Sequence, residues 1–392
     1  MTDFSFRQWR RQSPYYDETH DELEDNVRRF MQKEALPHVD AWEAAGMVPR
    51  EFHRKAGAAG ILGLGFPEEY GGTSEGIDNF HKLTLVDATA MTGAGGVQAG
   101  LFTHQIVLHP IIQYGIESLR RTVVPQIIAG EKILSVGVTE PSGGSDVANL
   151  KTRAERRGDR YIVNGSKTFI TNGMRADYVL TAVRTGGPGV GGISILLIPT
   201  DSRGFQRTQL RKMGWHASDT ATLYFEDLEV PVENLIGPEN EGFKTVMSRF
   251  NFERLQAAQQ CTAYARICLE DAAEWAQQRV TFGLKLGQHQ AIRIKLADMA
   301  RQLNQVQAWT DLCAWQDREG KSSSSDYALL KVSATLMFEQ LAREAAQILG
   351  GASYLQGSRV ERIYREVRVI AIGGGSEEVL LDMAGRHLGF GR

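Results

Sequence analysis

The stretch ILSVGVTEPSGGSD (Ile133–Asp146) marks the point at which this 392-residue sequence changes its pattern. Before it, apolar residues recur every three or four positions, as in HDELEDNVRRFMQKEALPHVDAWEAAG (His20–Gly46), which predicts amphipathic helices. From it onward come short runs rich in β-branched and aromatic residues, such as RYIVNGSKTFITN and GISILLIP, separated by Gly, Pro, Asn and Asp. This pattern predicts strands joined by hairpins as far as about Pro238.

Long helical patterns return after Asn240, at about residues 241–282, 288–318, 325–349 and 358–390, and glycine-rich turns separate them. The order of helices, strands and helices differs from the strand–helix alternation of a parallel α/β sheet. We therefore predict an α+β fold with an N-terminal helical domain (1–130), a middle antiparallel β-domain (131–238) and a C-terminal four-helix-bundle domain (239–392).

One tempting motif does not fit this order. Gly187–Gly192 matches GxGxxG letter for letter, but it enters the strand ISILLIP instead of leaving a strand and opening a helix. We interpret it as a hairpin loop, not as a dinucleotide site.

Composition and charge favour an ordinary globular protein. Hydrophobic residues make up 42% of the chain and the formal net charge is −3, so no basic surface points to a nucleic-acid or membrane partner. Cys261, Cys268 and Cys313 show no metal-ligand or disulfide spacing, so we expect no metal and buried thiols in a reducing compartment. Asp3 and Asp17 argue against a transit peptide, and we predict a cytoplasmic protein.

Two glycine-rich stretches could form a binding site. In GVTEPSGGSDVAN (Gly137–Asn149), small residues leave backbone N–H groups free to bind an anion, and Thr139 and Ser145 add hydroxyls. A simple turn after the strand is an equally good interpretation of this stretch. In QILGGASYLQGSRVERIYRE (Gln347–Glu366), a helix C-cap explains one glycine of GG, and the second indicates close approach of a backbone or a ligand.

Together these motifs resemble the acyl-CoA dehydrogenase family over about residues 20–390. GVTEPSGGSD matches the family's first signature, with a departure at Asn149, where a small residue is usual, and QILGGASYL…R…E matches the second. FITNG (Phe169–Gly173), PVENLIG (Pro231–Gly237) and RVTFGLKLGQHQAI (Arg279–Ile292) follow in the family's order. The resemblance implies FAD-dependent α,β-dehydrogenation of an acyl-CoA by a homotetramer, with an electron-transferring flavoprotein as the electron acceptor.

The resemblance also implies which residues contact FAD. Phe169 stands where many members have Trp, and either ring can cover one face of the isoalloxazine. Arg279 suits a pyrophosphate, although from the residues alone a surface charge at a helix end is the simpler interpretation. The implied set comprises Thr139, Ser145, Phe169, Thr171, Ser376 and Glu378, and from the neighbouring subunit Arg279, Thr281, Phe282, Gln290, Gln347 and Gly351. Gly350 also belongs to the set, without an assigned subunit.

The stretch IAIGGGSEEVL (Ile370–Leu380) raises the question of the catalytic base. In the family a glutamate removes the α-proton while flavin N5 takes the β-hydride, and many members carry that glutamate in this segment. Here Gly374 occupies the matching position. A second subgroup, which includes isovaleryl-CoA and long-chain dehydrogenases, places the base on the first long C-terminal helix in a Glu-Arg-Leu context, and NFERL supplies Glu253.

Helical periodicity gives an independent reason to consider Glu253. An apolar stripe on its helix comprises Val246, Phe250, Ala257, Cys261, Tyr264 and Cys268. Glu253 falls on the same face, where desolvation would raise its pKa as a general base requires. From spacing alone a surface pair with Arg249 is slightly favoured. With no carboxylate at position 374, we favour catalysis.

A glycine at position 374 keeps its backbone N–H, which in the family helps to polarise the thioester carbonyl, and it clears volume beside the reacting carbons. We therefore expect a branched or bulky acyl-CoA, with a 3-methyl-branched acid such as that of citronellyl-CoA favoured. The resemblance implies substrate contacts at Ser145, Asn251, Arg254 and Gly373. Two alternatives stay open: a flavin oxidase or monooxygenase on the same scaffold, and an inert flavin- or CoA-binding protein in which Gly374 marks a lost base.

Overall fold

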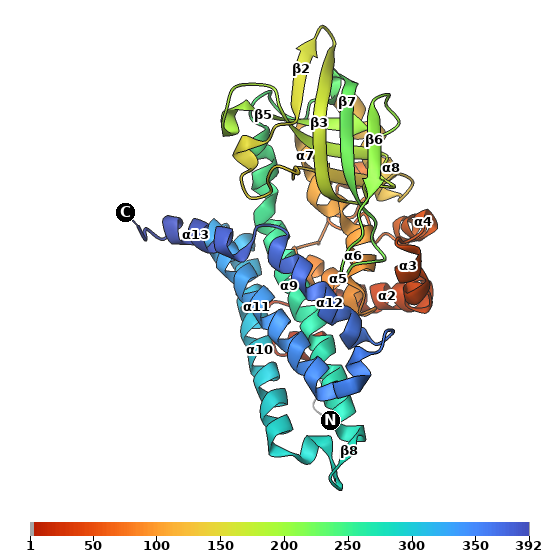
Figure 1. Ribbon diagram of the computed structural model, residues 1–392, viewed down its shortest axis with the longest axis vertical. Coiled ribbons are helices and arrows are strands. Elements are labelled where there is room, and N and C mark those ends of the chain that lie inside the picture. Colours follow the sequence, from red (N-terminus) through yellow and green to blue (C-terminus); the bar gives the residue numbers. More distant parts are fainter. Residues whose placement is uncertain (1–3, 392) are drawn as a thin grey trace. The chain divides into compact units, whose positions relative to one another are not determined.

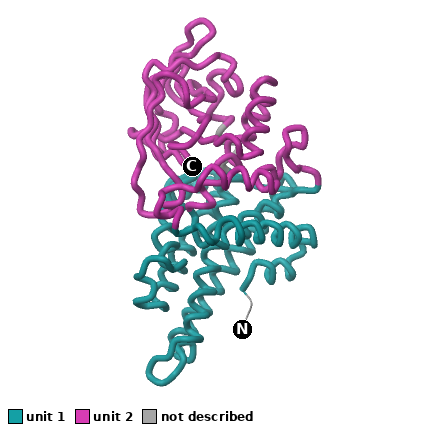
Figure 2. The backbone as a smooth tube through the Cα atoms, turned by 90° about the vertical axis from the view of Figure 1, so that its right-hand side faces the viewer, with its two compact units in different colours: residues 1–40, 76–95, 251–392 teal, residues 41–75, 96–250 magenta. Residues whose placement is uncertain are grey.

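The computed structural model describes residues 4–391, and for residues 246–250 it describes the backbone only. Helices fill the chain as far as Ile128 and again from Gly242, and the strands of one large sheet lie between them, which confirms the predicted α+β fold (Figure 1). Contacts divide the chain into two compact units (Figure 2): unit 1 holds residues 1–40, 76–95 and 251–392, and unit 2 holds residues 41–75 and 96–250. The domain limits at residues 130 and 238 stay a prediction.

Unit 1 is helical. Its elements are α1 (Phe6–Arg10), α2 (Glu18–Glu34), α5 (Asn79–Ala90), α9 (Gly242–Gln278) from residue 251 on, the hairpin of β8 (Val280–Thr281) and β9 (Leu284–Lys285), α10 (Gln290–Arg318), α11 (Ser324–Leu349), α12 (Arg359–Ile372) and α13 (Glu377–His387). The single helical segment expected at 358–390 is two helices, because three glycines and Ser376 intervene. Gly374 and Gly375 have φ of +70° and +107°, and this left-handed backbone cannot continue a right-handed helix.

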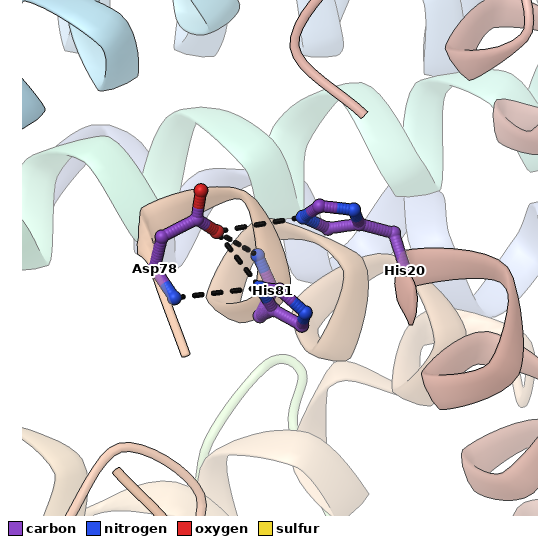
Figure 3. Close-up of side chains that lie close together, drawn as sticks. All are labelled: His20, Asp78 and His81. Atoms are coloured by element: carbon purple, nitrogen blue, oxygen red, sulfur yellow. Dashed lines mark hydrogen bonds and ion pairs between the residues drawn. The ribbon is translucent and has the colours of Figure 1, made fainter. Parts of the chain in front are cut away.

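The helices α2 and α5 begin with the same capping arrangement, in which an aspartate at the N-cap is paired with a histidine three residues later. Figure 3 shows Asp78 of the α5 cap together with His81 and His20. Asp78 Oδ1 lies 2.8 Å from His81 Nδ1 and 3.4 Å from His20 Nε2, and the two imidazole rings are 3.9 Å apart. The backbone N–H of Asp17 lies 3.0 Å from His20 Nδ1, and Thr19 Oγ1 lies 3.0 Å from His81 Nε2. All four ring nitrogens therefore have partners within this cluster, which ties the two helix N-termini together.

Unit 2 combines short helices with a seven-stranded, mainly antiparallel sheet. Its helices are α3 (Val39–Ala45, from residue 41 on), α4 (Arg50–Ala58), α6 (Gly95–Phe102, from residue 96 on), α7 (His104–Tyr114), α8 (Glu117–Ile128) and the first part of α9, up to residue 250. Its strands are β1 (Leu134–Gly137), β2 (Arg153–Arg157), β3 (Arg160–Thr171), β4 (Tyr178–Arg184), β5 (Ile193–Pro199), β6 (Phe205–Gln209) and β7 (Thr220–Pro231), in the order β1-β4-β2-β3-β7-β6, with β5 also paired to β4. β1 pairs with β4 in parallel, and β2 meets β4 in parallel at one position.

The core of unit 2 explains the apolar run ISILLIP. In β5, Ile193, Ile195 and Leu197 pack in a cluster with residues of α7 and α8, whereas Leu196 and Ile198 pack with residues of β3 and β7. A strand that is buried on both faces reads as a continuous apolar run. β4 and β5 pair antiparallel from Tyr178–Pro199 to Arg184–Ile193, so the glycine-rich stretch between them is the hairpin loop that we predicted.

The three cysteines are free and buried, as predicted from their sequence context. None of the helices in the described ranges combines the length and the apolar character that a membrane span requires.

Candidate active site

Glu253 lies in the first half of the part of α9 that belongs to unit 1. On the stripe that predicted its inward position, Cys261, Tyr264 and Cys268 are buried and Ala257 is half-buried. The side chains of the remaining stripe residues, Val246 and Phe250, and that of Arg249 lie outside the described residues.

The glycine corner, defined here as Gly373–Gly375 between α12 and α13, lies directly beside Glu253. A Cβ built on Gly374 would lie 3.7 Å from Glu253 Oε1 and 4.0 Å from its Cδ, and among the described side chains it would contact no other. The Glu253 carboxylate therefore faces Gly374, and a larger side chain at position 374 would enter the space beside the carboxylate. The fold thus brings Gly374, the position without a carboxylate, next to Glu253 on α9, as the hypothesis of a base on this helix requires.

Two cations hold the glycine corner through consecutive carbonyl groups. Arg254 Nε donates to Gly374 O at 3.4 Å, and Lys331 Nζ on α11 donates to Gly375 O at 2.8 Å. Sequence reasoning missed Lys331, although its place in the apolar run ALLKVSATL is a signal that a charged group is buried there.

The electrostatic surroundings of Glu253 suit a base. The side chain as a whole is partly exposed, but Oε2 is buried and has no hydrogen-bond partner among the described residues. Burial raises the pKa of the carboxyl to about 7, against the opposing positive charges of Arg254 and Lys331. A carboxylate with this pKa and no internal partner can accept a proton from a ligand near neutral pH.

The predicted substrate contacts on α9 lie around the same corner. Arg254 Nη1 donates to Asn251 Oδ1 at 3.1 Å, and Asn251 Nδ2 donates to Ser324 Oγ at the start of α11 at 3.1 Å. Asn251, Glu253, Arg254 and Gly373 therefore form one cluster, which also contains the unforeseen Lys331.

The first signature loop, after β1, is held by a buried ion pair. Glu140 Oε1 accepts from Lys167 Nζ at 2.8 Å and from the backbone N–H of Thr152 at 2.8 Å, while Glu140 Oε2 accepts from the N–H of Lys151 at 2.6 Å. Although burial opposes it, the charge of Lys167 and these hydrogen bonds hold the pKa of Glu140 at about 2. Glu140 is a second residue that the sequence analysis missed; its acidic side chain amid small residues was the available signal.

The exposed part of this loop offers unpaired donors. Within the described residues, the backbone N–H groups of Gly144 and Ser145 have no hydrogen-bond partner. The backbone N–H of Thr168 donates to Thr139 O at 2.9 Å, and Ser135 Oγ donates to Thr171 O at 2.8 Å. These bonds bring the loop beside the end of β3, so Thr139 and Thr171 lie on neighbouring segments.

Phe169 lies at a β-bulge in the same end of β3. The register with β7 shifts between Lys167 and Ile170, and Phe169 has a φ of +60° and an exposed fraction of 69%. A left-handed conformation in a bulky residue is strained, and such strain is concentrated at functional sites. The bulge turns an aromatic ring out of the sheet beside the signature loop.

The remaining predicted cofactor contacts fall into two groups within unit 1. Arg279, Thr281, Phe282 and Gln290 surround the β8–β9 hairpin, and Gln347, Gly350 and Gly351 end α11 near it, because Lys295 of α10 pairs with Glu344 of α11. Ser376 and Glu378 instead lie at the start of α13, beside the glycine corner. The hairpin and α13 lie toward opposite ends of the long helices (Figure 1).

Three family models match the chain in order: the acyl-CoA dehydrogenase N-terminal domain over residues 17–131, the middle domain over 135–228 and the C-terminal domain over 240–389. An acyl-CoA dehydrogenase of Alternaria alternata is 38% identical, over 94% of this chain and 91% of its own. The long-chain specific mitochondrial acyl-CoA dehydrogenase of Mus musculus is 33% identical, over 94% and 86%. The crystal structure of a probable acyl-CoA dehydrogenase from Mycobacterium abscessus is 44% identical and matches with a TM-score of 0.93, over 96% of this chain and 100% of that one.

Proposed function

This chain belongs to the acyl-CoA dehydrogenase family of FAD-dependent oxidoreductases, and we propose that Glu253 is its catalytic base and that its substrate is a branched or bulky acyl-CoA. The observation that carries the proposal is the position of the Glu253 carboxylate. Its Oε2 is buried without a partner, and its Oε1 is 3.7 Å from the point that a Cβ on Gly374 would occupy.

The reaction removes a proton from the α-carbon and a hydride from the β-carbon of the thioester, and FAD, when bound, supplies the acceptor for the hydride. Glu253 takes the α-proton: the α C–H bond breaks, an O–H bond forms on the carboxylate, and the freed electron pair moves toward the thioester carbonyl. The backbone N–H of Gly374 donates to the thioester oxygen and stabilises the charge that develops there. A pKa of about 7 for Glu253 is well matched to this task.

The glycine corner supports a substrate with bulk near the thioester. Within the part of the chain whose side chains are described, a Cβ on Gly374 would contact Glu253 alone, and one on Gly373 would contact only Val369 O, at 3.3 Å. A substituent on the substrate can therefore occupy the volume that a larger side chain would fill. We propose a 3-methyl-branched acyl chain such as that of citronellyl-CoA as the first class to test, with Asn251, Arg254 and Ser145 as further substrate contacts.

The residues present in unit 2 fit FAD. The unpaired N–H groups of Gly144 and Ser145 and the hydroxyl groups of Thr139 and Thr171 are donors of the kind that bind phosphate and flavin oxygens. The exposed ring of Phe169 offers a flat surface for an aromatic ring system. We propose that this surface holds the flavin, and on the family resemblance we propose Ser376 and Glu378 as further cofactor contacts.

The other proposed cofactor contacts support a homotetramer. From Glu253 to the end of α9, the helix extends about 40 Å, so one copy of unit 1 cannot bring both its glycine corner and its hairpin to one flavin ring. Around the hairpin and the end of α11, Phe282, Tyr354 and Leu355 are 99%, 90% and 68% exposed, and exposed apolar side chains of this kind mark interfaces. We propose that a neighbouring subunit supplies the hairpin and α11 contacts.

Three further proposals rest on the family resemblance or on the thiols. We propose an electron-transferring flavoprotein as the electron acceptor and three domains that meet near residues 130 and 238. Because the buried thiols are free, we propose the cytoplasm as the compartment.

The decisive experiment is anaerobic mixing of the FAD-loaded protein with straight-chain, isovaleryl-, and citronellyl-CoA while the flavin absorbance is recorded. We expect bleaching by the branched class in wild type and none in Glu253→Gln. Bleaching by straight chains alone would refute the substrate proposal. Bleaching that persists in Glu253→Gln would refute the base, and no bleaching by any acyl-CoA would favour the inert binder.

A further inference from the structure

Lys331 is a buried lysine on α11 whose ammonium group points at backbone and not at water. The residue is 1% exposed, and Nζ donates to Gly375 O at 2.8 Å. Lysine side chains ordinarily extend their ammonium group into solvent, because burial of a charge is costly without a specific partner. Because burial of this charge is costly, we look for its role in the hydrogen bond to Gly375 O, which an apolar side chain could not form.

The partner of Lys331 is the glycine corner, whose backbone conformation depends on contacts from other parts of the chain. Gly374 and Gly375 have no side chains through which the protein could fix them, and both are in left-handed conformations that glycine alone adopts readily. Arg254 binds the carbonyl of Gly374 and Lys331 binds the carbonyl of Gly375, so two successive peptide groups have fixed orientations. The Gly374 N–H belongs to the preceding peptide group, and its direction relative to these two groups is set by the φ and ψ torsions of Gly374.

We propose that Lys331 is a positioning residue for catalysis: its hydrogen bond to Gly375 holds the glycine corner against Glu253, so that the N–H of Gly374 stays directed at the substrate thioester. The inference rests on the proposed function of Glu253 and Gly374. It adds a residue from a third helix, α11, to a site that α9 and the α12–α13 corner otherwise form.

The charge of Lys331 gives a second effect that a purely structural residue would not have. Burial lowers the pKa of Lys331, and the positive charge of Arg254 adds to this change, while Cys261, Glu377 and Glu253 act against it. In return, the positive charges of Arg254 and Lys331 favour the ionised form of Glu253. Loss of the Lys331 charge should therefore raise the pKa of Glu253 and move its titration to higher pH.

The test separates proton abstraction from oxidation. In a thioester whose β-carbon is replaced by sulfur, a 3-thiaacyl-CoA, no β-hydride can leave, but Glu253 can still exchange the α-hydrogen with solvent deuterium. The exchange rate, measured by mass spectrometry in D₂O over a range of pH, gives a plateau rate and a midpoint for the base. In Lys331→Met we expect the plateau to fall about tenfold, as for loss of one hydrogen bond to a charged group, and the midpoint to move to higher pH.

Three variants make the result specific. Lys331→Arg keeps the charge and donors and should restore most of the plateau and the midpoint. Lys331→Gln is a second variant, less disruptive to packing, that should also shift the midpoint. Thr310→Val removes another buried side-chain hydrogen bond in unit 1, from Thr310 Oγ1 to Val306 O, and should change stability but not the pH profile.

The outcomes distinguish failure of the positioning role of Lys331 from failure of the proposed function of Glu253. A wild-type plateau and midpoint in both Lys331→Met and Lys331→Gln would overturn this inference and leave the role of Glu253 intact. If neither variant folds with bound FAD while Thr310→Val does, Lys331 is a residue of the fold, and the positioning role is rejected. Absence of exchange in wild type itself would refute the proposed function and this inference with it.

Discussion

Replacement of Glu253, the proposed catalytic base, by Gln should remove a pH dependence of stability. Burial raises the pKa of this carboxyl from 4.5 to about 7, so the folded protein binds the proton more tightly than the unfolded chain does. The stability that Glu253 contributes is therefore greatest below about pH 4.5 and is lost as the pH rises through about 7. A shift of this size corresponds to about 3 kcal/mol in all, of which about 2 kcal/mol falls between about pH 5.5 and pH 8.5.

The assay is urea unfolding of wild type and Glu253→Gln across this pH range, with the same excess of FAD in every sample. Because a buried Gln amide has a desolvation cost of its own at every pH, the diagnostic quantity is the change with pH and not the absolute stability. We expect wild type to lose about 2 kcal/mol relative to the variant from about pH 5.5 to pH 8.5.

Glu274 provides a matched control on the same helix. Its side chain is exposed and accepts a hydrogen bond from Gln278 Nε2 at 3.0 Å, so the stability of Glu274→Gln should run parallel to that of wild type over the pH range of the assay. If Glu253→Gln also ran parallel to wild type, the carboxyl would not be desolvated in the folded protein, and the reasoning for a raised pKa would fail.

Two further predictions concern the backbone positions that lie next to the reacting groups. Gly374→Ala introduces a side chain at a φ of +70° and should lower the free energy of unfolding by about 1–2 kcal/mol. Because the new Cβ would lie 3.7 Å from Glu253 Oε1 without a clash, the variant should fold, and its kcat/KM should fall more for branched than for straight acyl-CoA; equal losses would refute the steric role of Gly374. Phe169→Gly relieves a φ of +60° and should leave the free energy of unfolding without FAD unchanged or raised, while FAD binding, measured by flavin fluorescence, weakens about tenfold. Unchanged FAD affinity would show that the exposed ring does not contact the cofactor.

Much of the fold could be predicted because local patterns agree with it. The change of period near Ile133, the apolar run of β5 and the glycine-rich hairpin before it each depend on neighbouring residues in the chain. The split between α12 and α13 was predicted only in part, since the helical pattern resumes so soon after Gly375 that the two helices read as one segment.

The candidate site divides in the same way. Glu253 could be predicted, because both its helical spacing and the glycine at position 374 can be read from the sequence alone. The contacts of Lys331 and the pairing of Glu140 with Lys167 could not be predicted, although each residue stands out in its own stretch. For Lys331 the reason is that 78 residues separate it from Glu253, and only the packing of α11 beside the glycine corner relates the two. The bulge at Phe169 depends on the register between β3 and β7, which no pattern within β3 determines.

The surroundings of Glu253 contain two opposing effects, and their balance is itself an argument for function. Burial alone would drive the carboxyl toward permanent protonation, whereas the charges of Arg254 and Lys331 favour ionisation, and the outcome is a pKa of about 7. Neither cation forms a hydrogen bond with the carboxylate among the described residues; each binds a carbonyl of the glycine corner instead. A direct ion pair would lower the pKa of Glu253 and occupy the oxygen that must accept the proton. Arg254 and Lys331 act on Glu253 through space while they bind the opposing backbone, so the carboxyl has a pKa of about 7 and its oxygens are available for the proposed proton transfer.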